Sequence, residues 1–133
     1  MDKEVKNFNE KYGNTFCIKP FSEVASTPLG AIKLCCYSGT IDPKEEYFSK
    51  DKTIKQVFNN NAGLIQARKD LLAGKKIKQC QGCWKDEEAG NKSMRINHTQ
   101  YYDEMDPEFV QQAKQQGKAE VKSIDIKFGN KCN

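Results

Sequence analysis

The chain has 133 residues, of which only 37% are hydrophobic, so it fits one domain whose apolar core must be small. Its net charge of +4 is spread over interspersed lysines and glutamates, without the clustered basic stripe that indicates nucleic-acid binding. No apolar run approaches the ~18 residues of a membrane span, and the charged first residues lack a secretory signal, so we expect a cytoplasmic protein with no membrane partner.

The first part of the chain predicts a polar segment followed by a hairpin. Residues 1–13 are expected to form a short helix or a tail. Residues 16–21 and 30–37 should form two paired strands, with a turn over residues 23–29 between them. Gly30 would begin the return strand, where glycine takes a positive φ at little cost.

Two helices are predicted next, each with its own start signal. Thr53 heads a sequence typical of a capping box. Asn60 or Asn61 can cap a second helix from about residue 62 to 73, and Gly74 follows as a C-terminal cap.

The last third of the sequence predicts one more helix and one strand. Residues 85–105 are expected to be irregular. Asp106 and Pro107 favour a helix start that Gly117 ends. Residues 121–128 alternate apolar and polar side chains, which predicts a strand.

The six cysteines are the most informative residues, because without an export signal they indicate metal or redox chemistry. Cys17 and Cys35 form a C-x12-G-x4-C block with Gly30, and Cys80 and Cys83 form a C-x2-C block. Four soft thiolates select zinc or an iron–sulfur cluster. The 17 residues between Cys17 and Cys35 favour a cluster, which is larger than one ion. Zinc is the alternative, and three disulfides would apply to a secreted protein.

Three residues near these blocks have predicted roles of their own. Neighbouring residues of a strand face opposite ways, so we assign Cys35 to the site and treat Cys36 as a small buried hydrophobe or a substitute ligand. Trp84 is expected to cover the site with an apolar surface. His98, the single histidine, is expected to be an exposed bystander.

Together these motifs resemble those of radical S-adenosylmethionine enzymes that carry a SPASM or twitch auxiliary domain, here ahead of the barrel. The C-x12-G-x4-C block resembles the first cysteine block of that domain, and the helix with C-x2-C resembles the segment after it. GNKSMR, residues 90–95, fits the G-x2-S-x-R pattern of the family. IDIKFGNKCN, residues 124–133, resembles the first barrel strand and the opening of the C-x3-C-x2-C motif.

The resemblance implies that Cys17, Cys35, Cys80 and Cys83 ligate one auxiliary [4Fe–4S] cluster, for electron transfer or structural support. Cys132 would be the first ligand of a second, catalytic [4Fe–4S] cluster that binds S-adenosylmethionine, with its other ligands beyond this sequence. The chain would then be an N-terminal fragment of an enzyme of unknown substrate, with no complete catalytic motif of its own. Its partners would be the radical SAM barrel in cis and a reductant such as flavodoxin or ferredoxin.

The expected fold is therefore α+β, with a small β-hairpin and helices around a four-cysteine site. The expected segments are an N-terminal tail (1–13), a twitch-like auxiliary cluster domain (14–105), a connecting helix (106–120) and the first strand of a truncated α/β barrel (121–133).

Overall fold

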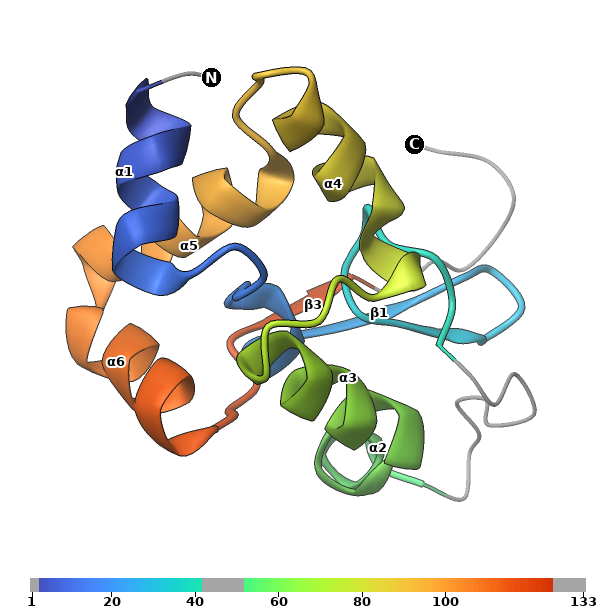
Figure 1. Cartoon of the computed structure of the whole chain (residues 1–133). Helices are drawn as coiled ribbons and strands as arrows, with labels where there is room; N and C mark the ends of the chain where they lie inside the picture. The colour runs from blue at the N-terminus through green and yellow to red at the C-terminus, as the bar shows by residue number, and fades with distance from the viewer. Residues whose placement is uncertain (1–2, 42–51, 126–133) are drawn as a thin grey trace.

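The computed structural model describes residues 3–41 and 52–125, and over these ranges the fold is α+β (Figure 1). Six α-helices and two 3-10 turns surround a small three-stranded sheet in this part of the chain. Their order is α1 (Lys3–Tyr12), η1 (Lys19–Phe21), β1 (Glu23–Ser26), β2 (Ile32–Lys33), α2 (Ile54–Asn60), α3 (Ala62–Leu72), η2 (Lys78–Cys80), α4 (Gln81–Glu88), α5 (Met94–Met105), α6 (Pro107–Gln116) and β3 (Ser123–Asp125).

The sheet is mixed, with strand order β2-β1-β3. Strand β1 pairs antiparallel with β2 across a tight turn, with Ala25 opposite Lys33. It pairs in parallel with β3, with Val24 opposite Ile124. Because β1 is central, all four of its residues are buried. The helices α2 to α6 lie in sequence between β2 and β3, so they form the long crossover that parallel pairing requires.

The hairpin exists, but its first strand lies later in the sequence than predicted. Its return strand, expected over residues 30–37, is shorter than predicted and spans only Ile32–Lys33. The strand expected over residues 16–21 is wrong, since Pro20 occupies the first turn of η1 and its ring removes a backbone donor. The turn expected over residues 23–29 is wrong in its first half, where β1 runs. Its second half is correct, because the Gly30 N–H donates to the Thr27 carbonyl at 2.9 Å and Gly30 has a φ of 89°.

Helix boundaries that depend on local capping follow the predictions. Thr53 and Gln56 form a capping box, in which each side chain accepts the other's backbone N–H. Asn61 caps α3 by accepting the Leu64 N–H at 2.9 Å. Gly74 and Gly117 follow α3 and α6 with φ values of 88° and 70°, as expected of residues after a helix end. The predicted aspartate cap and proline open α6.

The irregular segment expected over residues 85–105 is wrong, because this stretch contains the second half of α4 and all of α5. Helix α5 begins at a Ser93 cap whose hydroxyl accepts the Ile96 N–H. Polar side chains occupy its buried face: Arg95 and Thr99 are at most 1% exposed. Helix prediction depends on apolar residues that recur with helical periodicity, and this pattern is weak where buried positions are polar.

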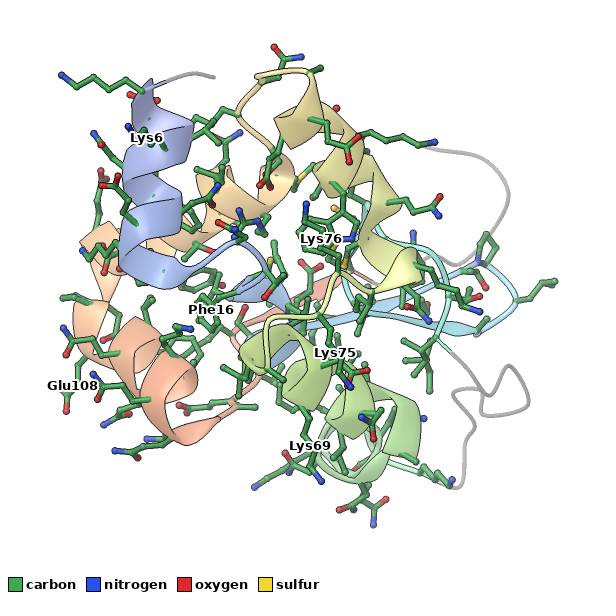
Figure 2. All side chains as sticks on the ribbon, in the orientation of Figure 1. Lys6, Phe16, Lys69, Lys75, Lys76 and Glu108 are labelled. Atoms are coloured by element: carbon green, nitrogen blue, oxygen red, sulfur yellow. The ribbon has the colours of Figure 1, made fainter. Side chains whose placement is uncertain are left out.

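Helices α1, α5 and α6 enclose the largest core, and Figure 2 shows Phe16 pointing between them while Lys6 and Glu108 extend outward. Its buried members are Val5, Phe8, Tyr12, Phe16, Ile18, Phe21, Ile96, Phe109, Val110 and Ala113. Residues 3–12 therefore form a packed helix rather than a loose tail. No helix in the described ranges has the length and apolar character needed to cross a membrane.

A second core lies between the hairpin and helices α2 and α3. Its buried members are Ile32, Leu34, Ile41, Val57, Leu64 and Ala67. A small third cluster joins Leu71, Cys83 and Trp84. Cys83 belongs to this third cluster, and Cys80 packs against both it and the second core, so the positions of these thiols depend on packing between several elements.

Candidate metal centre

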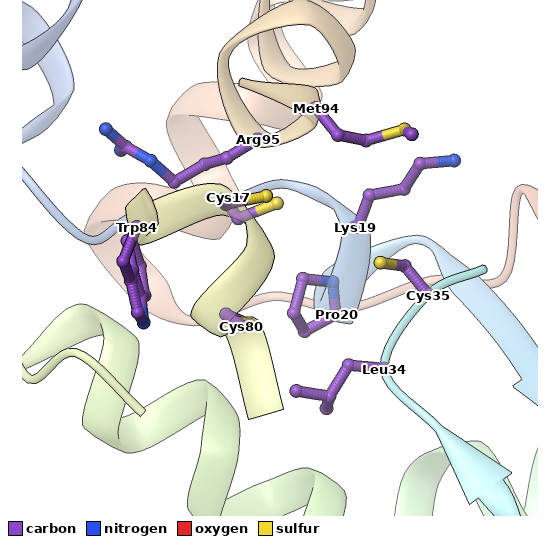
Figure 3. Close-up of a pocket in the computed structure, with 10 residues that line it drawn as sticks. Cys17, Lys19, Pro20, Leu34, Cys35, Cys80, Trp84, Met94 and Arg95 are labelled. Atoms are coloured by element: carbon purple, nitrogen blue, oxygen red, sulfur yellow. The ribbon is translucent and has the colours of Figure 1, made fainter. Parts of the chain in front are cut away.

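The four cysteines of the two sequence blocks line one cavity (Figure 3). Cys17 lies between α1 and η1, Cys35 follows β2, and Cys80 and Cys83 lie in η2 and the first turn of α4. Cys17, Cys35 and Cys83 are buried, and Cys80 is half-buried. The fold therefore gathers thiols from three segments that are far apart in the sequence.

The rest of the cavity wall is contributed by apolar side chains and the stems of two cations. These residues are Lys19, Pro20, Leu34, Trp84, Met94 and Arg95. The cavity measures about 20 Å³, little more than the ~10–15 Å³ that one water molecule needs by this measure. A cube of four irons is larger than this cavity, so binding it would require the four thiols to move apart. Within residues 3–41 and 52–125, no three histidine, cysteine or acidic side chains already have the arrangement that holds a single metal ion.

Burial raises the pKa of all four thiols. The pKa of Cys35 is about 11 and that of Cys80 about 12, with the nearby thiols of Cys35 and Cys83 adding to the rise at Cys80. Burial raises the pKa of Cys17 well above its ordinary value and raises that of Cys83 as well. The metal-free thiols are therefore protonated at neutral pH, and a metal must displace their protons.

Three backbone N–H groups oppose this effect by hydrogen bonding to sulfur. They belong to Lys19, Tyr37 and Arg95, and they lower the pKa of Cys17, Cys35 and Cys83 respectively. Such bonds favour a thiolate over a thiol. The donor set, four thiols with backbone N–H groups facing three of them, suits a thiolate-bound metal group.

A tight turn after β2 determines which of the adjacent cysteines faces the cavity. The Ser38 hydroxyl accepts the N–H groups of Leu34 and Cys35 at 3.0 and 3.2 Å, so the chain leaves the sheet at once. Cys35 then points inward. Cys36 is exposed, and its N–H donates to the Glu23 carboxylate. The prediction of a buried Cys36 is wrong, because the strand ends before Cys36 can pack beneath it.

Trp84 covers one side of the cavity, in agreement with the role expected of it. It is 7% exposed and packs with Cys83 and Leu71. Its indole N–H donates to the Ile77 carbonyl at 2.8 Å. This bond fixes the ring orientation and satisfies its one polar group.

Gly82, between the two cysteines of the C-x2-C block, admits a second aromatic ring. A Cβ at this position would lie 2.6 Å from the Tyr37 ring, which is closer than carbon atoms approach. Tyr37 therefore lies directly against the turn between Cys80 and Cys83. Packing of the Tyr37 ring therefore requires a glycine at this position, and the spacing of the cysteines alone does not reveal this requirement.

Arg95 is the residue near the cavity whose role the sequence did not predict beyond its place in the G-x2-S-x-R pattern. It is 1% exposed, and its guanidinium binds both carboxylate oxygens of Glu87 at 2.8 and 2.6 Å. It also donates to Asn9 Oδ1 at 2.6 Å and to the Phe16 carbonyl at 2.9 Å. The signal in the sequence that could have indicated this ion pair is an acidic residue, Glu87, and a basic residue, Arg95, on either side of the turn at Gly90.

His98 lies apart from the cysteines and is half-buried rather than exposed as predicted. Its Nε2 is 2.8 Å from the Met94 sulfur, and burial lowers its pKa. It lines a different depression together with Lys19, Glu23 and the tyrosines of α5. Cys132 lies outside the described residues.

Comparison with known proteins identifies no relative: no protein family, no curated protein and no solved structure matches this chain. The assignment of the site therefore rests on the residues of the chain.

Proposed function

We propose that the chain is an auxiliary iron–sulfur module of a radical S-adenosylmethionine enzyme, binding one [4Fe–4S] cluster through Cys17, Cys35, Cys80 and Cys83. One observation carries the proposal: these four thiols line a common cavity while Cys36 faces solvent. In a chain with a small apolar core, buried thiols grouped in this way are typical of a metal-binding site. Binding of the metal there contributes to the free energy of folding.

When bound, the cluster would supply one-electron transfer or structural support, since four thiolates leave no iron open to substrate. The residues of the chain prepare the site for this group. Trp84, Leu34 and Pro20 contribute apolar surface to the cavity wall. Backbone N–H groups of η1, of the turn after β2 and of α5 donate to sulfur and stabilise the thiolates.

Anaerobic reconstitution with iron and sulfide tests cluster binding. We expect about four irons per chain and a broad absorption near about 400 nm, as a fully thiolate-bound cube requires. Cys83→Ser should lose most of the bound iron. Cys36→Ser is the matched control and should keep it, because Cys36 is exposed. Equal iron loss in both variants would contradict the assigned ligand set.

A zinc-stabilised four-cysteine binding module without catalytic activity is the second candidate, and the small cavity favours it. It predicts one tightly bound zinc per chain, no uptake of iron and sulfide, and loss of folding on chelation. Metal analysis of the protein purified without oxygen distinguishes the two functions, because they differ in both the metal and its stoichiometry.

The catalytic half of the proposal concerns the complete protein. A radical SAM barrel in the same polypeptide would use Cys132 and two further cysteines to bind the catalytic cluster and S-adenosylmethionine. Incubation of the complete protein with S-adenosylmethionine and dithionite should then release 5′-deoxyadenosine. If the complete protein binds the auxiliary cluster but releases no 5′-deoxyadenosine, the enzyme assignment is contradicted and the assignment of the auxiliary cluster stands.

A further inference from the structure

A buried ion pair, Arg95 with Glu87, lies beside the cysteine cavity and joins the segments that supply its thiols. Glu87 belongs to α4, the helix of Cys83, and Arg95 belongs to α5. The side chains of Arg95 and Glu87 are 1% and 11% exposed, with a shortest separation of 2.6 Å.

The same guanidinium binds the segment that carries Cys17. It donates to the carbonyl of Phe16, the residue before Cys17, at 2.9 Å and to that of Gly13 at 3.2 Å. Figure 3 shows the Arg95 side chain extending from α5 past Cys17 and toward Trp84. Arg95 thus connects the first cysteine block to the second, which no other described ion pair does.

The two charges of the pair act on the sulfurs with opposite sign. Arg95 lines the cysteine cavity, and Glu87 follows Cys83 by four residues on α4, so both charges lie close to the sulfurs. Other charges nearby are the Lys19–Glu23 pair, at 2.9 Å, and Asp86 of α4, whose carboxylate accepts the Tyr37 hydroxyl at 3.4 Å. Buried charges interact more strongly than exposed ones, because water screens them less.

We propose that Arg95 and Glu87 form a positioning pair that holds the Cys83 helix against the Cys17 loop and sets the reduction potential of the bound cluster. This inference rests on the proposed function. Reduction adds one electron to the cluster and no proton, so a nearby cation favours the reduced form and a carboxylate opposes it. The pair keeps the potential between the two limits that either charge alone would impose.

Substitutions that remove one charge at a time test the proposal through the potential. Glu87→Gln keeps the size of the side chain and one acceptor oxygen for the guanidinium, although its amide NH2 cannot replace the second acceptor. The bonds of Arg95 to Asn9, Gly13 and Phe16 remain, so the cation stays in place and is uncompensated. The reduction potential of the cluster in this variant should rise. At a fixed solution potential, the ratio of reduced to oxidised cluster should increase about tenfold, which corresponds to about 59 mV for one electron. Arg95→Met leaves the carboxylate uncompensated and should shift the potential in the opposite direction.

Arg68→Lys is the matched control. Arg68 is also buried, at 8% exposed, and its guanidinium binds the carbonyls of Pro20 and Phe58 at 2.7 and 2.8 Å. It joins η1 to α2 and makes no ion pair with any residue that the structure describes, so Arg68→Lys should change stability and leave the potential unchanged.

The measurement is a redox titration of the reconstituted protein, in which the spectrum of the reduced cluster is recorded at each potential. Dithionite supplies the electrons, and mediators carry them to the cluster. A rise for Glu87→Gln with no change for Arg68→Lys supports the proposal. An unchanged or lowered potential in Glu87→Gln overturns it while cluster binding stands, and this variant alone decides if Arg95→Met does not fold. A wild-type protein that takes up no cluster overturns the proposed function and this inference with it.

Discussion

At the scale of single residues, the buried thiols make the metal-free chain sensitive to alkaline pH. An unfolded thiol ionises near its ordinary pKa of 9.0, whereas Cys35 and Cys80 ionise at about 11 and 12 in the folded chain. The unfolded state therefore loses protons first, and the stability present below pH ~9 falls as the pH rises toward 11–12. Each of these thiols should lower the free energy of unfolding by about 1 kcal/mol at pH 10.

Urea unfolding of the metal-free protein at pH 7.5 and at pH 10 measures this loss. Cys35→Ser should show a smaller loss between the two values, because serine does not ionise in this range. Cys36→Ser should behave as the wild type, since Cys36 is exposed in the folded chain. An identical pH dependence in wild type and Cys35→Ser would contradict the attribution to the buried thiol.

At the scale of secondary-structure elements, the cap of α3 links helix formation to the core beneath the hairpin. Asn61 is 6% exposed, and its side chain accepts the Leu64 N–H at 2.9 Å. Asn61→Ala leaves that N–H buried without its acceptor, so we expect a loss of about 1–2 kcal/mol in the free energy of unfolding.

Asn61→Ser, which keeps a capping oxygen, should recover most of the loss. The exposed cap offers a comparison, because Thr53→Ala removes a cap that water can partly replace. Its cost should be below that of Asn61→Ala, as chemical denaturation of the three variants will show. A larger cost for the Thr53 variant would contradict the role given to burial.

The elements that the sequence predicted well are those whose signals are local. Asn61 and Gly74 act through backbone groups within a few residues, so their pattern is sufficient to locate the ends of α3. Strand β1 is different, because EVAS has no alternating pattern. Glu23 is buried there because its carboxylate pairs with Lys19 at 2.9 Å and accepts the Ser123 hydroxyl. Those partners come from η1 and β3, and a local pattern does not include them.

At the scale of the whole molecule, the four thiols of the two blocks line one cavity, but their spacing does not indicate what surrounds them. The two blocks indicated Cys35 rather than Cys36, and the structure buries Cys35 in the cavity. Arg95 was found only through its contacts, which span 79 residues to Phe16 and 86 to Asn9. Contacts at such separations depend on how the helices pack, which no short motif determines.

The same packing predicts that helix α1 and the cysteine cavity unfold together. Phe8 is 4% exposed in the main core, and its ring lies 5.1 Å from the Arg95 guanidinium. Phe8→Ala should therefore lower the free energy of unfolding by about 3–5 kcal/mol, a large part of the ~5–15 kcal/mol typical of a domain. The fluorescence of Trp84, the single tryptophan, reports on the cavity, and far-UV circular dichroism reports on the helices. In wild type and variant the two signals should change at one urea concentration, shifted lower in Phe8→Ala. A Trp84 transition that does not move in the variant would show that α1 is an independent appendage rather than part of the core that supports the site.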